Sequence, residues 1–173
     1  QVLHAPYDYK KARLIVREMA DALALDLVDK KFVTDQIVLT VGYDIENISN
    51  KDILNDYKGE ITEDRYGRKI PKHAHGTANL DGYTSSSKEI IGAVLDLYDR
   101  IMNPKLLVRR INVVACRVLR ETDVPEESPF EQLDLFTNYE ELEQERKEKK
   151  EELAKEKNMQ KAIIGLQKKY GKN

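Results

Sequence analysis

Apolar residues in the first part of the chain repeat with two different periods. Over residues 12–27 they recur every three or four positions with charged residues between them, which predicts a helix that begins at Asp8 or Tyr9. The positions expected to face the core are Ile15, Met19, Leu23 and Leu27. Over residues 36–43 apolar positions alternate with others, which predicts a strand. Its apolar face would carry Ile37, Leu39, Val41 and Tyr43.

The middle of the chain predicts a second strand followed by a second helix. Residues 72–80 carry polar side chains at odd positions and small or apolar side chains at even positions, so the strand would have two unlike faces. Ser86 and Glu89 then form a capping box, and apolar residues follow at helical spacing until Asn103-Pro104 ends the helix. Ser85 and Ser87 lie at the same helix start, where serine is favoured as a cap rather than as a nucleophile.

Two further segments complete the pattern of strands. Residues 106–119 are rich in β-branched side chains and predict a strand, and residues 1–4 form a short apolar fragment expected to be an edge strand. Residues 44–70 are polar and are expected to form a loop with a small hairpin and a short helix near residues 53–57. The order β-α-β-β-α-β predicts an α+β sandwich, with two helices on one face of a four-stranded, largely antiparallel sheet.

The other face of this sheet would be open to a ligand. Its predicted polar and cationic side chains are His73, His75, Thr77, Arg109 and Arg110. Since successive side chains of a strand point to opposite faces, alternation alone does not say which of the two arginines faces outward.

The net charge of the chain does not indicate a nucleic-acid-binding protein, but one local cluster of basic residues does. The chain has 29 basic and 31 acidic residues and a net charge of −2, whereas a phosphate-binding surface needs clustered cations. Residues 65–75 contain Arg65, Arg68, Lys69 and Lys72 and no acidic residue. This run predicts a nucleic-acid-binding patch, and a solvated turn with incidental lysines is the alternative.

Candidate chemistry other than binding is scarce. His73 and His75 could share a metal, but His4 is the only other histidine and no carboxylate cluster adjoins them, so a surface pair is favoured. No Gly-rich phosphate loop and no paired catalytic carboxylates occur, so we expect no catalytic residue, metal or cofactor in this chain. The single cysteine, Cys116, is expected to be a buried thiol of a cytoplasmic protein, and no apolar run is long enough to span a membrane.

The last part of the chain differs in composition from the rest. Residues 126–131 are acidic and contain Pro129, which predicts an exposed linker. Gln132, Leu133, Leu135 and Phe136 follow, and they have the spacing of a short docking peptide. The alternative is a helix start whose apolar residues fold back on the domain. Residues 140–161 are dense in Glu, Lys, Arg and Gln and predict a long, solvated, charged helix.

These motifs together resemble a known family. The predicted strand and helix order, Val108-Arg109-Arg110-Ile111, and the peptide of residues 132–136 are similar to the C-terminal part of a Y-family translesion DNA polymerase. The run from Tyr66 to Gly76 and Asp99-Arg100-Ile101 resemble the UmuC/ImpB/MucB/SamB-type polymerases of Gram-positive bacteria.

The resemblance implies a division of labour along the chain. Residues 1–120 would be the little finger, or polymerase-associated, domain, whose open sheet binds primer-template DNA through Arg65, Arg68, Lys69, Lys72, His73, His75, Thr77, Arg109 and Arg110. Residues 121–138 would be a linker with a peptide that binds the bacterial sliding clamp, the DNA polymerase III β subunit. Residues 139–173 would be a charged helical tail. The resemblance also implies that the palm carboxylates and their Mg²⁺ lie upstream of Gln1, and that error-prone synthesis across damage during the SOS response belongs to the intact enzyme. The start at Gln1 without a Met is likewise expected of a piece of a longer protein.

Two departures from the family pattern raise further expectations. Gly76 occupies a place where the family often has an arginine, so the phosphate grip is expected to shift to neighbouring cations. Residues 44–70 are longer than in compact relatives, and 37 residues follow the docking peptide. The competing hypothesis is a non-catalytic protein-protein adaptor that uses the open sheet and the C-terminal helix.

Overall fold

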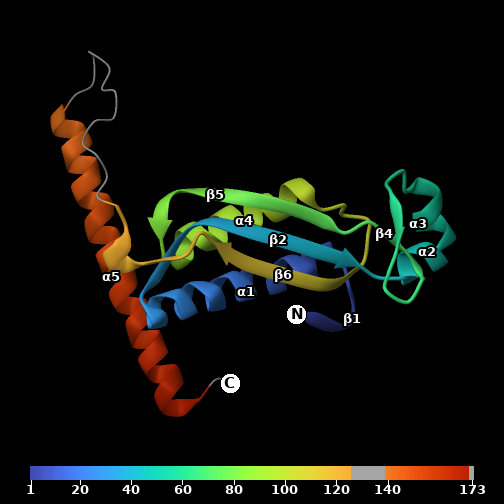
Figure 1. Cartoon of the computed structure of the whole chain (residues 1–173), viewed down its shortest axis with the longest axis horizontal. Helices are drawn as coiled ribbons and strands as arrows, with labels where there is room; N and C mark the ends of the chain where they lie inside the picture. Colours follow the sequence, from blue (N-terminus) through green and yellow to red (C-terminus); the bar gives the residue numbers. More distant parts are fainter. Residues whose placement is uncertain (126–138, 172–173) are drawn as a thin grey trace.

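An antiparallel sheet backed by two helices forms the body of the molecule (Figure 1). Four strands form its continuous path, and a short fifth strand pairs with one of them. The computed structural model describes residues 1–125 and 139–171. The body follows the predicted order: β1 (Val2–Tyr7), α1 (Tyr9–Lys30), β2 (Phe32–Tyr43), β5 (Ala74–Thr84), α4 (Ser87–Ile101) and β6 (Val108–Cys116). The predicted α+β sandwich is therefore confirmed.

The strands lie in the order β1-β6-β2-β5, and β1 and β5 form the two edges. Both helices cover the same face, and the strands lie in front of them in Figure 1. The inward residues of β2 are those that the alternation predicted: Ile37, Leu39 and Val41 are fully buried and Tyr43 is 7% exposed. The opposite face of the sheet carries no helix of the described chain.

The core face of α1 differs from the predicted one. Ala12, Val16, Ala20 and Ala24 are fully buried, whereas Ile15, Met19 and Leu23 are only partly buried. Small side chains let α1 approach the sheet and α4 closely, and the larger residues then fill the margins of the contact. The prediction is confirmed for Leu27, which is 5% exposed in the core. It was wrong for the other three positions because it followed the largest apolar side chains rather than the alanines beside them.

A small insertion stands at one end of the sheet. It comprises α2 (Glu46–Ser49), α3 (Lys51–Asp56), β3 (Ile61–Glu63) and β4 (Lys69–Pro71), which confirms the predicted short helix and hairpin. Asn47 is 1% exposed and fixes the insertion to the body. Its Nδ2 donates to the carbonyl oxygens of Asp44 and Leu107 at 2.8 and 2.9 Å, and its Oδ1 accepts from the Leu107 amide at 2.8 Å.

Strand boundaries shift by several residues from those predicted. β2 begins four residues earlier, at Phe32, and β5 runs from Ala74 to Thr84 rather than from residue 72 to 80. β6 ends at Cys116 because Arg117 adopts a left-handed conformation with φ 50°. The chain then forms β7 (Leu119–Arg120), which pairs with the start of β2, and η1 (Glu121–Asp123). Cys116 is half-buried, not buried as expected.

The C-terminal helix α5 (Tyr139–Tyr170) crosses the far end of the body (Figure 1). It is highly charged, as predicted, but one of its faces is not solvated. Ile164 packs against Leu25 and Val28 of α1, and the buried Gln160 donates to the Ser85 carbonyl oxygen at 3.0 Å. Neither α5 nor any other helix among the described residues has an apolar stretch able to cross a membrane.

The docked face of α5 also completes the start of α4. Ser86 Oγ accepts from the Glu89 amide at 3.2 Å, as the capping box predicts. The carboxylate that accepts the Lys88 amide proton, at 3.0 Å, belongs to Glu156 of α5, which also accepts from Ser86 Oγ at 2.7 Å. A carboxylate at this position satisfies free amide groups and complements the positive end of the helix dipole.

Candidate nucleic-acid interface

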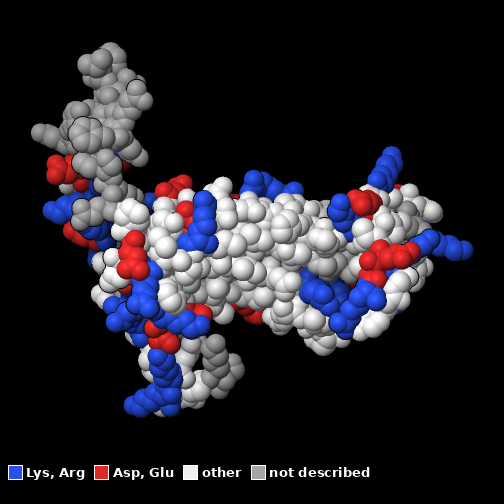
Figure 2. All heavy atoms as spheres, in the orientation of Figure 1, with Lys and Arg blue, Asp and Glu red and all other residues white. Residues whose placement is uncertain are grey.

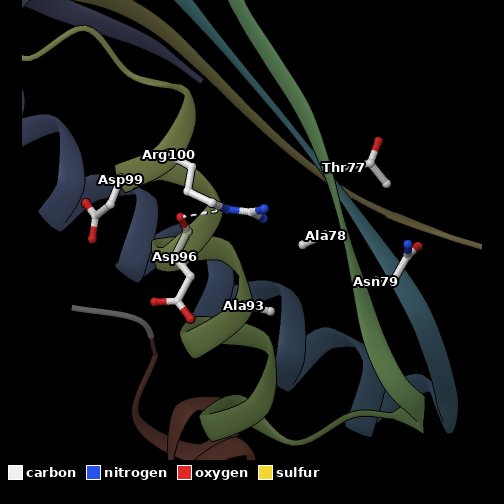
Figure 3. A pocket seen from close by; sticks show the side chains of 7 residues that line it. All are labelled: Thr77, Ala78, Asn79, Ala93, Asp96, Asp99 and Arg100. Atoms are coloured by element: carbon white, nitrogen blue, oxygen red, sulfur yellow. Dashed lines mark hydrogen bonds between the residues drawn. The ribbon is translucent and has the colours of Figure 1, made fainter.

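The two faces of β5 differ in chemistry, as its sequence predicts. Thr77 and Asn79 point away from α4, whereas Ala78 between them points toward it (Figure 3). His75, Thr77 and Asn79 are exposed, and Ala78 is 5% exposed. The outward residues of β5 therefore lie on the open face of the sheet, as expected for His75 and Thr77.

Pairing across the strands arranges this open face in rows. One row joins Thr77, Val38 and Val114, and the next joins His75, Thr40 and Asn112. Thr40 Oγ1 and His75 Nδ1 lie 2.9 Å apart in a hydrogen bond. Neither row contains a charged side chain, and Figure 2 shows a broad area without Lys, Arg, Asp or Glu over the strands, with basic residues gathered toward its ends.

A β-bulge decides how the two consecutive arginines of β6 are displayed. Gly42 pairs with Arg110 and Tyr43 pairs with Val108, so Arg109 has no opposite residue on β2. The extra residue lets Val108 and Ile111 both point into the core, where each is fully buried. Arg110 continues the outward row, and a Cβ placed on Gly42 would lie 3.4 Å from the Arg110 Cβ on that side.

Both arginines line one hollow between the sheet and the insertion, with a volume of about 550 Å³. Arg68 and His73 line it from the insertion side, and Asn112 lines it from the sheet. Arg109 Nε lies 3.7 Å from Asp44 Oδ2, whereas Arg110 is exposed and has no carboxylate partner within the described residues. The sequence could not choose between the two arginines, and the fold brings both to the same site.

Ion pairs neutralise part of the positive charge of the basic run at residues 65–75. Arg68 forms an ion pair with Asp64 at 2.7 Å, and Lys72 forms one with Glu60 at 2.6 Å. Hydrogen bonds from Arg68 hold the pKa of the Asp64 carboxyl below its ordinary value. The run has no acidic residue, but residues immediately before it supply carboxylates, because the β3–β4 hairpin folds them back alongside. Arg65 and Lys69 have no carboxylate partner among the described residues.

Two residues near the open face were not singled out from the sequence. Tyr66 is 65% exposed at the tip of the hairpin, and the Arg65 guanidinium lies 4.6 Å from its ring centroid. Arg117 stands at the other end of β6, where its Nε lies 3.0 Å from Asp35 Oδ1. The signal for Tyr66 was an aromatic residue between two arginines in a Gly-containing turn, whereas nothing in the sequence marked the left-handed turn at Arg117.

Gly76 does not face the open side of the sheet, so the premise that its missing side chain weakens the phosphate grip is wrong. The expected shift of that grip to neighbouring cations stays a prediction. A Cβ placed on Gly76 would lie 2.8 Å from Leu97 Cδ1 and 3.1 Å from Ile101 Cγ2, so this position faces α4. A side chain here would enter the helix layer instead of reaching DNA, and its absence removes nothing from the open face. The glycine lets α4 pack closely against β5.

A second hollow lies along the edge of β5, between Ala78 of the strand and Ala93, Asp96 and Arg100 of α4 (Figure 3). Arg100 extends from the helix toward the strand, and its Nε donates to the Asp96 carbonyl oxygen at 3.4 Å.

Over residues 1–125 and 139–171, no group of three His, Cys, Asp or Glu side chains could hold a metal ion. Gln132, Leu133, Leu135 and Phe136 lie outside the described residues.

Comparison with known families bears on what this face contacts. The chain matches the impB/mucB/samB family C-terminal domain over residues 4–135. The chain belongs to this family. It is the C-terminal region of a Y-family polymerase of the UmuC/ImpB/MucB/SamB type, which confirms the family that its motifs resemble. The Gram-positive origin stays a prediction. No curated protein matches the chain at a significant level.

The family match covers the body of the molecule but not the C-terminal helix. The impB/mucB/samB domain takes in α1, α4 and the sheet except the first two residues of β1, and it extends through residues 132–135 of the predicted docking peptide. α5 lies beyond the matched range, although its Glu156 completes the start of α4 inside it. The division into residues 1–120, 121–138 and 139–173 stays a prediction.

Proposed function

We propose that this chain is the module that holds duplex DNA for a translesion polymerase, with the open face of the sheet as the contact surface. The observation that carries the proposal is the uncharged middle of that face together with Arg109 and Arg110 at one end of β6. Phosphate contacts give affinity that ignores sequence, which a polymerase that accepts damaged templates requires.

The spacing of the cations supports this arrangement. β6 continues for six residues from Arg110 to Cys116, which corresponds to about 20 Å at ~3.3 Å per residue, and Arg117 follows directly. This distance exceeds the ~12 Å width of the major groove. Cations at the two ends can therefore approach phosphates on both sides of the groove, while the polar side chains of His75, Thr77 and Asn112 face its floor. Arg65, Lys69, Lys72 and His73 extend the contact at the insertion end.

Fluorescence anisotropy with a labelled blunt duplex tests the proposal. We expect weak binding that falls steeply as salt rises and does not depend on sequence. Arg110→Ala should weaken binding to all duplexes alike, by about 1 kcal/mol for one lost phosphate contact. Lys30→Ala removes a cation from the helix side of the molecule and is the matched control, which should bind as the parent does.

Salt-independent binding, or equal affinity of the Arg110→Ala and parent chains, would overturn the proposal. Binding of a polypeptide to the open face in place of DNA would favour the adaptor hypothesis instead.

We also propose that Gln132, Leu133, Leu135 and Phe136 dock into the bacterial sliding clamp. Two leucines and a phenylalanine can fill adjacent apolar pockets, and the glutamine amide can bond a backbone group beside them. A tether of this kind raises the local concentration of the polymerase at the primer end. Nucleotidyl transfer with Mg²⁺ is proposed for a catalytic core outside this sequence and for none of its residues.

A further inference from the structure

The tip of the β3–β4 hairpin holds one aromatic ring against two guanidinium groups. The guanidinium carbons of Arg65 and Arg68 lie 4.6 and 5.1 Å from the centroid of the Tyr66 ring. Tyr66 is nevertheless 65% exposed. Burial of the ring is therefore not what determines its position, and a large part of its surface is available to a ligand.

The turn that presents this ring is fixed by hydrogen bonds. Asp64 Oδ1 accepts from the amides of Tyr66 and Arg68 at 2.8 and 3.0 Å, and Asp64 Oδ2 accepts from Arg68 Nε at 2.8 Å. Gly67 has a φ of 74°, which a side chain would disfavour, and it closes the turn. A ligand that contacts Tyr66 thus meets a backbone that is already ordered, so little conformational entropy is lost on binding.

The charge of the tip does not favour a simple phosphate contact. Residues 63–69 contain three basic and two acidic side chains, and the charge of Arg68 is balanced by Asp64 at 2.7 Å. What distinguishes the tip is a set of flat surfaces, one aromatic and two guanidinium. Unpaired nucleobases stack on such surfaces, whereas the bases of an intact duplex are already stacked on each other.

The hairpin also lies beside the surface that is proposed to hold the duplex. Arg68 lines the hollow that contains Arg109 and Arg110, so the tip adjoins the insertion end of the open face. We propose that the hairpin tip binds an unpaired base of single-stranded DNA next to the duplex, with Tyr66 as the stacking surface and Arg65 and Arg68 beside it. This inference rests on the proposed function, because it assigns the tip to the same bound DNA.

A tryptophan reporter tests the inference directly. The chain contains no tryptophan, so Tyr66→Trp places a single indole at the tip. A duplex with a thymidine overhang should quench its fluorescence, because stacking on a base quenches indole emission, and a blunt duplex of the same length should quench it far less. Quenching that is equal for both, or absent with the overhang DNA, would overturn the inference.

Affinity measurements on the full chain separate this inference from the proposed function. Tyr66→Ala should weaken binding to the overhang duplex about tenfold and leave the blunt duplex unchanged. Tyr66→Phe keeps the ring and is the matched control, which should retain the preference for the overhang. Binding of the blunt duplex with no gain from an overhang overturns this inference alone, whereas failure to bind either DNA overturns both proposals.

Discussion

At the scale of single residues, Asn47 shows how the insertion is attached to the sheet. Its side chain is almost completely buried, and its three hydrogen bonds all go to backbone groups of Asp44 and Leu107. These groups belong to the chain on either side of the hollow, after β2 and before β6. Asn47 therefore reinforces the backbone hydrogen bond, 2.9 Å long, from the Asp44 amide to the Leu107 carbonyl oxygen.

We expect Asn47→Ala to lower the free energy of unfolding by about 2–3 kcal/mol, because it removes three hydrogen bonds and leaves the Leu107 amide without its acceptor. Urea unfolding followed by circular dichroism measures the change. Asn55→Ala, at an exposed position of α3, is the matched control and should alter stability by less than about 0.5 kcal/mol. Equal stability of the two variants would contradict this account of Asn47.

The sequence could predict site residues wherever strict alternation held. It placed His75 and Thr77 on the open face, since β5 has no irregularity between them and the residues that face α4. The sequence could not predict which face of the sheet Arg109 and Arg110 occupy. A bulge changes the alternation of inward and outward side chains, and the residue types do not reveal it. The ion pairs of Arg68 and Lys72 were also beyond prediction, since they depend on how the hairpin folds.

At the scale of elements, a polar network joins the outer surfaces of α1 and α4. Arg13 donates from Nε and Nη2 to the two carboxylate oxygens of Asp99, at 2.9 Å each, and Tyr9 Oη donates to the same carboxylate. The hydrogen bonds from Arg13 are the main cause that lowers the pKa of Asp99. The network orients the two helices that support the open sheet from behind.

This lowered pKa predicts how the network responds to acid. The carboxylate form of Asp99 is favoured in the folded protein, so its contribution to stability is present above the unfolded pKa of about 3.9 and is lost as the pH falls through the folded value. The side chains of Arg13 and Asp99 are both 39% exposed, so solvent screens their interaction. The free energy of unfolding of the parent should therefore exceed that of Asp99→Asn by less than about 1 kcal/mol at pH 7. Urea titrations at pH 7 and at about pH 3 should show this difference shrinking, and a difference independent of pH would contradict it.

Element order was easier to predict than element contacts. The periods of two and of three to four residues gave the β-α-β-β-α-β order, because each element buries only one face. The contact of α5 with the body was not predictable, since a helix with few apolar residues looks solvated throughout. Its attachment depends on Ile164, Gln160 and Glu156, and the last two are polar residues whose partners lie about 70 positions earlier.

At the scale of the whole molecule, DNA binding and clamp binding are proposed for separate parts of the chain. Replacing both Leu135 and Phe136 with Ala should weaken binding to the bacterial clamp by at least about 2 kcal/mol, as for buried apolar anchors of other interfaces. Calorimetric titration against the clamp measures the loss. Duplex binding in the anisotropy assay should be unchanged.

The reciprocal variant is the control for this separation. Arg110→Ala should bind the clamp with the affinity of the parent while its hold on duplex DNA weakens. Unchanged clamp affinity in the Leu135 and Phe136 double variant would favour the alternative in which these side chains belong to the domain's own packing.

The bulge at Arg109 has a consequence for how such a surface can diverge. In a regular stretch of a strand, inserting or deleting one residue would send every later side chain to the wrong face. At the bulge the chain already carries one residue more than its partner, so its length can change there while Val108 and Ile111 keep their places in the core. Single-codon insertions and deletions, which most strands do not tolerate, can thus alter the number of outward cations at this one point of β6.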